Sequence, residues 1–312
     1  METGLGGGAM ERVLVVDDSL VFRKVIKATL ETAGYEVLTA ENGGKAMQLL
    51  QEEGSPDIIL LDRVMPDMDG VEVCKWARNH FCNLYGTSYK YFIILTSKNT
   101  QDDVLEGFGI GADDYVIKPF CNQELLARLT VACRVLKMQR ELLNAAIRDA
   151  LTGLYNRRSL YDLLGLELLR ARREQSNVAV ALVDVDRFKQ INDTYGHAIG
   201  DEMLIMLAAK LRMTMRDFDI VGRLGGEEFV LAFGCMSVGD ALVICERVRR
   251  GVAEISINCE ETVLSMTISI GVAIAIGETE PAKVIRYADK AMYQAKENGR
   301  NCVVAYEYTK DG

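Results

Sequence analysis

Short apolar segments that end in polar residues alternate with longer segments of helical periodicity over residues 12–135. The apolar segments cover 12–18, 35–40, 57–62, 91–97 and 114–119, and the helical segments between them include 20–33 and 42–53. Strands that alternate with helices predict a parallel sheet covered by helices on both faces. We therefore expect a five-stranded, doubly wound α/β domain with its functional residues at the carboxyl ends of the strands.

Those strand ends carry a set of charged and hydroxyl side chains: Asp17 and Asp18, Asp62, Thr96, and Lys118. Three carboxylates brought close together repel one another unless a divalent cation lies between them, and oxygen ligands suit Mg²⁺. A solvated loop acid would explain any one of these residues. It does not explain the whole set in register with the strands, so we expect a magnesium site at this edge.

This part of the chain, residues 11–135, resembles the flavodoxin-like receiver domain of two-component response regulators. The resemblance implies that Asp62 is the phosphoacceptor and that Asp17 and Asp18 hold Mg²⁺. It also implies that Thr96 and Lys118 contact the phosphoryl group and that Tyr115 is the switch aromatic. The implied partner is a histidine kinase or a phosphotransfer protein. Phosphorylation would add a charge of roughly −1.5 to −2 at the acceptor.

A segment without Gly or Pro runs from Asn122 to about Arg148. Its apolar residues recur at heptad-like spacings, with Arg140 interrupting them: Leu129, Cys133, Leu136, Leu143 and Ile147. One interpretation is a last helix that lies on the sheet, which explains 122–134 but not the continuation. The other is a linker over 136–148 that pairs with its copy in a homodimer, which we expect.

The second half, residues 149–308, alternates apolar and helical segments as well. The run 178–185 predicts a buried strand that ends at Asp184, and 219–233 predicts a hairpin broken at Gly225–Gly226. Further strands are expected at 264–275 and 302–306, with helices over 237–255 and 281–298. Glycines at a hairpin tip let the backbone approach a ligand closely. The tip then presents Glu227 beside Asp184 as a hard-cation site, although "GGEE" alone is also typical of a surface turn.

Five segments of this half resemble the GGDEF family of diguanylate cyclases: "DALTGLYNRR", "DVDRFKQINDTYGHAIGD", "RLGGEEFV", "ISIGVA" and "ADKAMYQAKENGRN". The resemblance covers about residues 148–306 and implies a palm-like α/β fold with a mixed sheet. It implies that two GTP condense to cyclic di-GMP with release of pyrophosphate. The implied metal is Mg²⁺, or Mn²⁺ in its place.

The same resemblance implies roles for individual residues. Asp184 and Glu227 bind the metal, with Glu228 alongside, and Glu227 helps to deprotonate the attacking 3′-hydroxyl. The expected substrate-binding residues are Asn192 and Asp201 for guanine, and Phe188, Lys189, Lys296 and Arg300 along the phosphates. A product-inhibition motif, RxxD, is present as "RDFD", which assigns Arg216 and Asp219 to cyclic di-GMP, with Arg247 as a second contact. Alone, this pair would be an exposed salt bridge.

Other classes of protein fit less well. A net charge of −9 without a basic stripe argues against direct binding to DNA. The chain has two histidines and no CxxC pair among eight cysteines, which argues against zinc and is typical of a reducing cytoplasm. No apolar run predicts membrane insertion, and residues 1–10 are expected to be a flexible tail. The alternative function is a non-catalytic cyclic di-GMP-binding signalling protein.

Overall fold

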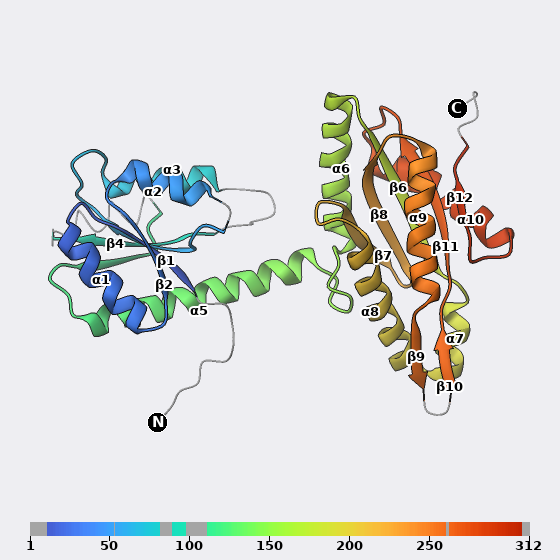
Figure 1. Cartoon of the computed structure of the whole chain (residues 1–312), viewed down its shortest axis with the longest axis horizontal. Coiled ribbons are helices and arrows are strands. Elements are labelled where there is room, and N and C mark those ends of the chain that lie inside the picture. Colours follow the sequence, from blue (N-terminus) through green and yellow to red (C-terminus); the bar gives the residue numbers. More distant parts are fainter. Residues whose placement is uncertain (1–10, 53, 82–88, 98–110, 260–261, 308–312) are drawn as a thin grey trace. The chain divides into compact units, whose positions relative to one another are not determined.

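The computed structural model describes residues 11–307 except 53, 82–88, 98–110 and 260–261 (Figure 1). The chain divides into two compact units, Met1–Leu143 and Asn144–Gly312. Each unit has its own sheet and its own hydrophobic core, so each is described by itself. No helix in the described ranges combines the length and the apolar character that a membrane span requires.

The first unit is built on five parallel strands, in the order β2-β1-β3-β4-β5. Their bounds are Arg12–Val16 (β1), Glu36–Ala40 (β2), Ile58–Asp62 (β3), Tyr91–Thr96 (β4) and Asp114–Ile117 (β5). The central strands β3 and β4 are buried along their whole length, as the continuous apolar runs predicted. The expected doubly wound architecture is confirmed.

Helices cover both faces of this sheet (Figure 1). The helices α1 (Leu20–Thr32) and α5 (Asn122–Ile147) share one core with the sheet, whereas α2 (Gly43–Gln51) and α3 (Gly70–His80) share the other. Local sequence sets where they begin: Ser19 and Asn42 are N-cap residues whose side chains accept hydrogen bonds from main-chain N–H groups of the first turn. The capped start of α1 lies just after β1, and the start of α3, capped by Asp69, packs against the main chain of Asp62 at the end of β3.

The helix α5 is continuous through the predicted linker, but its predicted pairing stripe was partly wrong. Leu129 and Leu136 are buried and Cys133 is half-buried against the sheet of the first unit, so these three cannot pair with a second copy. Leu143 and Ile147 are half-buried. A different row of apolar side chains, at spacings of four, three and four, is exposed on α5: Val131, Val135, Met138 and Leu142.

The interruption of the predicted stripe at Arg140 has a structural reason. Its guanidinium donates to Oδ2 of Asp57 at 2.5 Å and to Oε1 of Glu11 at 3.3 Å. Asp57 also pairs with the buried ammonium of Lys90 at 3.0 Å. Arg140 therefore holds the exposed half of α5 against the amino-terminal edge of the sheet.

The second unit contains a mixed sheet in the order β12-β11-β6-β8-β7, in which only the pair β11–β12 is parallel. The strands are β6 (Asn177–Val185), β7 (Ile220–Gly225), β8 (Glu228–Cys235), β11 (Ile268–Ala275) and β12 (Val303–Ala305). The segment 264–275, expected to be one strand, is divided. Its first part belongs to β10 (Thr262–Ser265), which pairs with β9 (Ser256–Cys259) in a separate hairpin.

Two helical layers enclose this sheet (Figure 1). One contains α6 (Arg157–Glu174) and α10 (Pro281–Glu297), and the other contains α7 (Phe188–Tyr195), α8 (His197–Thr214) and α9 (Val238–Ala253). Gly271 explains the tight fit of α10 on β11. A Cβ atom there would overlap the main chain of α10 at Ala288 and Met292. Because Gly271 has no side chain, α10, which carries Lys296, can pack directly on β11.

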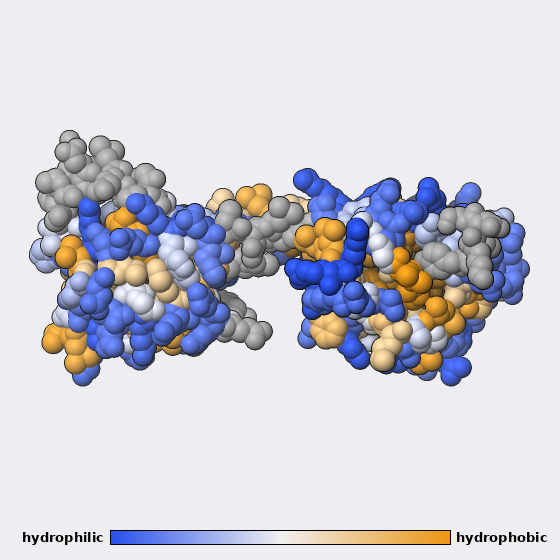
Figure 2. Space-filling view, turned by 90° about the horizontal axis from the view of Figure 1, so that it is seen from above, coloured by the Kyte–Doolittle hydropathy of each residue, from blue (hydrophilic) through white to orange (hydrophobic). Residues whose placement is uncertain are grey.

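Exposed apolar side chains occur in both units. Figure 2 shows hydrophobic groups within the otherwise hydrophilic visible surface of each. Besides the row on α5, they include Met213 and Val243, which line a hollow of about 990 Å³ between α8 and α9. Single exposed apolar residues are ordinary on protein surfaces. The regular spacing on α5 distinguishes that row from the others.

Candidate functional site

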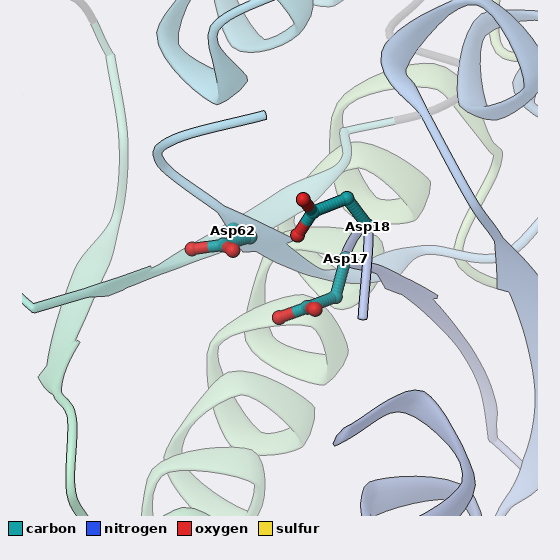
Figure 3. Close-up of side chains that lie close together, drawn as sticks. All are labelled: Asp17, Asp18 and Asp62. Atoms are coloured by element: carbon teal, nitrogen blue, oxygen red, sulfur yellow. The ribbon is translucent and has the colours of Figure 1, made fainter. Parts of the chain in front are cut away.

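The first candidate site lies at the carboxyl ends of β1 and β3. Ligand oxygens of Asp17, Asp18 and Asp62 come within 4.8 Å of one another, and Figure 3 shows the three carboxylates facing a common space. Asp17 is buried and Asp18 is exposed, so the cluster opens to solvent on one side. Three converging carboxylate oxygens fit a hard divalent cation.

An ammonium group completes this cluster. Nζ of Lys118, which follows β5, lies 2.8 Å from Oδ2 of Asp17 and 3.0 Å from Oδ1 of Asp62. Burial raises the pKa of Asp62 above its ordinary value, the hydrogen bond and charge of Lys118 oppose this, and the charge of Asp17 adds to it. A cation and an ammonium beside one carboxylate would neutralise an incoming phosphoryl group.

Thr96 and Tyr115 lie on the two strands next to this cluster. Leu95 on β4 is paired in register with Asp62, which places the buried Thr96 one residue beyond it. Tyr115 on β5 is paired with Ile94 and is buried. Asp17, Asp18, Asp62, Thr96 and Lys118 therefore lie at or just beyond neighbouring strand ends, whereas Tyr115 lies near the start of β5.

The second candidate site is organised by the hairpin of β7 and β8. Gly225 pairs with Glu228, so Gly226 and Glu227 form the tip. Gly226 has φ +50°, a backbone conformation that favours glycine, and no atom lies within 4 Å of a Cβ placed on it. The tip therefore leaves open space above its backbone, where a ligand can approach closely.

A residue that the sequence did not single out holds this tip in place. Nε and Nη2 of Arg223 donate to the carbonyl oxygen of Gly226 at 2.9 and 2.7 Å, and Nη1 donates to Oδ1 of Asp149 at 3.0 Å. Although burial opposes it, hydrogen bonds from Thr152 and Arg223 hold the pKa of Asp149 below its ordinary value. Asp149 lies two residues after the end of α5, so the clamp joins the segment that follows this helix to the hairpin tip.

The carboxylates of the second site meet across the sheet. Asp184 on β6 is paired in register with Glu228 on β8, and Glu227 precedes Glu228 at the tip. Burial is the main reason why the pKa values of Asp184 and Glu228 are raised, and the neighbouring carboxylates add to the effect. Nζ of Lys296 lies 2.8 Å from Oδ2 of Asp184 and opposes it. The buried Asp184 and the half-buried Glu227 and Glu228, like charges beside an open tip, fit a divalent cation.

A pocket of about 340 Å³ lies over these groups. Its lining contains six of the residues expected from the sequence: Asp184, Phe188, Lys189, Glu227, Lys296 and Arg300. The side chain of Phe188 also belongs to the hydrophobic core of this unit. Lys189 and Arg300 are exposed. Acids at the base with cations at the rim suit a metal-bound polyphosphate.

The two residues expected to read guanine lie where α7 meets α8. Oδ1 of Asn192 is buried without a hydrogen-bond partner among the described residues. Asn192 packs against Gly200, which precedes Asp201 on α8. A buried amide oxygen without a partner costs about 1–3 kcal/mol, so it is expected to accept a hydrogen bond when a ligand is bound.

The RxxD segment lies at the opposite end of β7 from the hairpin tip. The carboxylate of Asp219 accepts from the main-chain N–H of Arg216 at 2.9 Å. Within the described residues no ion pair joins their side chains, so the exposed salt bridge expected for an unspecialised pair is not formed. Arg247 donates to the carbonyl oxygen of Thr214 at 3.2 Å, two residues before Arg216. The guanidinium of Arg216 is exposed.

A further arginine near this segment was missed from the sequence. Arg170 on α6 lines a hollow of about 340 Å³ together with Asp217, Phe218 and Asp219. Arg170 forms an ion pair with Glu174 on its own helix at 3.1 Å. The i, i+4 spacing in the sequence predicts this pair but not the proximity of Arg170 to Asp219. Its proximity to Asp219 depends on the packing of α6 beside β7.

Comparison with known families divides the chain in the same way. Residues 146–302 match the model described as "Diguanylate cyclase, GGDEF domain", and residues 13–130 match "Response regulator receiver domain". The matches include both candidate sites. The expectation of a receiver followed by a GGDEF domain is confirmed.

Individual relatives agree with this division. The response regulator PleD of Caulobacter vibrioides is 32% identical over 311 residues, which cover 96% of this chain and 66% of PleD. Diguanylate cyclase DgcM of Escherichia coli is 40% identical over 169 residues, covering 54% of this chain and 40% of DgcM. The chain thus spans about two thirds of the first relative and less of the second.

Among solved structures, the second unit is similar to the GGDEF domain of DgcB from Caulobacter crescentus in complex with c-di-GMP. The TM-score is 0.50 and the sequence identity is 31%, over 52% of this chain and 94% of that one. The similarity confirms the expected α/β fold with a mixed sheet.

Proposed function

Because the chain belongs to the GGDEF family of diguanylate cyclases and carries a response-regulator receiver domain, we propose that it synthesises cyclic di-GMP under phosphorylation control. The observation that carries this proposal is the register pair Asp184–Glu228 beneath the glycine tip, with Lys296 and Arg300 lining the same pocket. A degenerate, purely binding relative would not need the buried Asp184 beside the half-buried Glu228. Removing carboxylates from water costs free energy, and a bound divalent cation offsets that cost.

In the proposed reaction, the 3′-oxygen of each GTP attacks the α-phosphorus of the other. Two phosphodiester bonds form, two α–β phosphoanhydride bonds break, and two pyrophosphates leave. Mg²⁺ or Mn²⁺ bound by Asp184 and Glu227 would supply positive charge at the reacting phosphates. Glu227 takes up the proton of the attacking hydroxyl, and Glu228 supports the charge of the site. Lys189, Lys296 and Arg300 bind and orient the phosphates.

Base recognition is assigned to Asn192 and Asp201. A carboxylate on Asp201 accepts from N1–H and the exocyclic amine of guanine, whereas adenine offers neither donor in that arrangement. The unpartnered amide of Asn192 supports a second polar contact with the base. Specificity then follows from polar groups that adenine would leave unpaired.

We propose that two copies must come together, since one GGDEF domain holds one GTP and the reaction needs two. The exposed row Val131, Val135, Met138 and Leu142 on α5 has the spacing of a coiled-coil seam and replaces the stripe first expected. Linking two cyclase domains through such a seam makes their encounter effectively intramolecular. The proposed oligomer is therefore a homodimer.

Phosphorylation of Asp62 by a histidine kinase or a phosphotransfer protein is the proposed input. Lys118 would shift its ion pairs from Asp17 and Asp62 to the phosphoryl oxygens, and Thr96 would donate to the same group. Repacking at Tyr115 would then change the surface formed by β4 and β5. Mg²⁺ held by Asp17, Asp18 and Asp62 would bring the phosphodonor and the acceptor together.

Feedback by the product is assigned to the RxxD segment. Arg216 and Arg247 suit the phosphates of cyclic di-GMP, and Asp219 suits the donors of a guanine. The strand β7 joins this segment to the catalytic tip over six residues, roughly 20 Å. Because the proposed substrate GTP and the proposed phosphodonors are found in the cytoplasm, we expect the protein to act there. We expect neither direct DNA binding nor membrane insertion.

The proposed function is tested by incubating the purified chain with Mg²⁺ and GTP and identifying the products. Cyclic di-GMP and pyrophosphate in a 1:2 ratio are expected, with more product in the presence of beryllofluoride. A chain that binds cyclic di-GMP tightly but forms none from GTP would instead be a non-catalytic sensor. Failure to bind either nucleotide would reject both functions.

A further inference from the structure

Asp186 lies two residues beyond Asp184 but does not have the free oxygens of a metal ligand. Its Oδ1 accepts from the hydroxyl of Ser269 at 2.6 Å. Its Oδ2 accepts from the hydroxyl of Thr267 at 2.7 Å and from the main-chain N–H of Asn301 at 3.0 Å. The buried carboxylate therefore joins the end of β6 to the turn that follows α10.

That turn has an unusual backbone. Gly299, Arg300 and Asn301 have φ of +105°, +66° and +48°. Left-handed conformations are costly for an ordinary residue and persist where surrounding contacts impose them. Asn is among the residues that tolerate this region, whereas Arg is not. Arg300, which lines the catalytic pocket, is therefore held by its neighbours in a conformation that it would not choose alone.

The side chain of Asn301 supplies a second anchor. Its Oδ1 accepts from Nη1 of Arg249 on α9 at 2.5 Å. The same guanidinium is fixed by Glu246, which accepts from Nε at 2.8 Å and from Nη2 at 2.7 Å. The planar fork of arginine suits such a set of three acceptor contacts, and lysine does not reproduce it. The turn is thus tied to β6 through Asp186 and to α9 through Arg249.

We propose that Asn301 and Arg249 are positioning residues that hold Arg300 against the triphosphate of GTP. Neither residue touches the substrate in this proposal. They act through Arg300, whose phosphate contact depends on the left-handed turn. The inference rests on the proposed function, because it takes the pocket over Asp184 as the GTP site. The proposal predicts that loss of either anchor weakens only the binding of the β- and γ-phosphates. Binding of the base should be unaffected, because guanine is assigned to residues on α7 and α8.

Two variants of Asn301 separate the anchor from the backbone conformation. Asn301→Gly keeps a left-handed turn but removes the acceptor of Arg249, and Asn301→Asp keeps both. The ligands are 3′-deoxyguanosine triphosphate, which lacks the attacking hydroxyl, and 3′-deoxyguanosine monophosphate, measured by calorimetry with Mg²⁺. Asn301→Gly should lower the affinity for the triphosphate roughly 10-fold, which is the scale of one charge-assisted hydrogen bond. Its affinity for the monophosphate should equal that of the parent. Asn301→Asp should bind both like the parent.

A double-mutant cycle tests whether the effect passes through Arg300. Arg300→Asn removes the guanidinium and tolerates the same backbone. In that background Asn301→Gly should cause no further loss of triphosphate affinity. Arg249→Lys should reproduce the selective loss, because its ammonium cannot form the planar fork.

Equal weakening of both nucleotides by Asn301→Gly would show general damage and overturn the positioning role, as would an unchanged triphosphate affinity. Additive losses in the cycle would also overturn it. These results differ from a failure of the proposed function. A parent chain that binds the triphosphate but forms no cyclic di-GMP would reject the cyclase and leave this test intact, whereas no nucleotide binding at all would reject both.

Discussion

The side chain of Asn192 occupies the space beside Gly200 that a Cβ atom would need. This contact joins α7 to α8 where each helix carries a residue that the proposed function assigns to guanine. Gly200 is therefore required for its small size and not for its backbone conformation. Since Asp201 is the next residue, a shift at this contact would disturb both polar groups that are assigned to the base.

Gly200→Ala is accordingly expected to displace Asn192 and weaken recognition of guanine. The KM for GTP should rise roughly 10-fold, on the scale of a lost hydrogen bond, and discrimination against ATP should fall. The measurement is cyclase kinetics with GTP alone and with GTP and ATP mixed. Gly165→Ala is the matched control, because it adds the same methyl group to α6 at an ordinary 3.6 Å contact with Pro281. Unaltered base selectivity in Gly200→Ala would contradict the assignment of Asn192.

Glu227→Gln should reduce cyclic di-GMP formation at least about 100-fold, the usual scale for losing an electrostatic contact in the transition state. The change removes one charge from the metal site and preserves the shape of the hairpin tip. Initial rates are compared with those of Glu297→Gln, an exposed change on α10 that should behave like the parent. A rate for Glu227→Gln within a few-fold of the parent would reject its role.

Beryllofluoride, which mimics a phosphoryl group on an aspartate, should raise both the dimer fraction and the cyclase rate. Asp62→Asn should lose this response but keep a basal rate, because the cyclase pocket is intact. Light scattering and initial rates provide the two measurements. Asp67→Asn, an exposed neighbour, should respond like the parent. A full response in Asp62→Asn would remove this residue from the switch.

Leu142→Glu should oppose dimer formation, since it places a charge in the exposed apolar row of α5. The side chain is 70% exposed, so the fold of the single chain should be unaffected. The dissociation constant of the activated dimer should rise, and the cyclase rate at low protein concentration should fall. Lys137→Glu introduces the same group on another face of α5 and serves as control. Equal effects of both changes would point to net charge and not to the row.

Arg216→Ala should weaken cyclic di-GMP binding roughly 10- to 100-fold, as expected for hydrogen bonds to a charged group. Initial rates at low product should stay near those of the parent, because the segment lies at the far end of β7 from the catalytic tip. Slowing of the reaction as product accumulates should largely disappear. Calorimetric titration and full progress curves test both points, with Arg212→Ala as an exposed control. A variant that stalls at the same product concentration as the parent would exclude an inhibitory role.

Features that follow from chain periodicity could be predicted from the sequence. Parallel strands end at one edge, so Asp17, Asp62 and Lys118 could be brought together without coordinates. The hairpin at Gly225–Gly226 follows from local signals as well. The resemblance to known families supplied the individual roles within the second half.

Contacts that depend on packing could not be predicted in the same way. The clamp of Arg223 on Asp149 spans 74 residues and leaves no periodic trace. On α5, two apolar rows have similar spacing, and only the position of the sheet decides that Leu129 and Leu136 are buried while Met138 and Leu142 are exposed. Spacing alone therefore favoured the wrong row for pairing.

The hydrogen bond between Asp186 and Asn301 spans 115 residues, and α10 follows the other helices and strands of the pocket proposed for GTP. A ribosome therefore releases Lys296 and Arg300 after the whole receiver and most of the second sheet. Since domains generally fold in the order of synthesis, the receiver can complete its sheet before the pocket exists. A newly made chain would thus acquire its means of control earlier than its capacity to produce a signal.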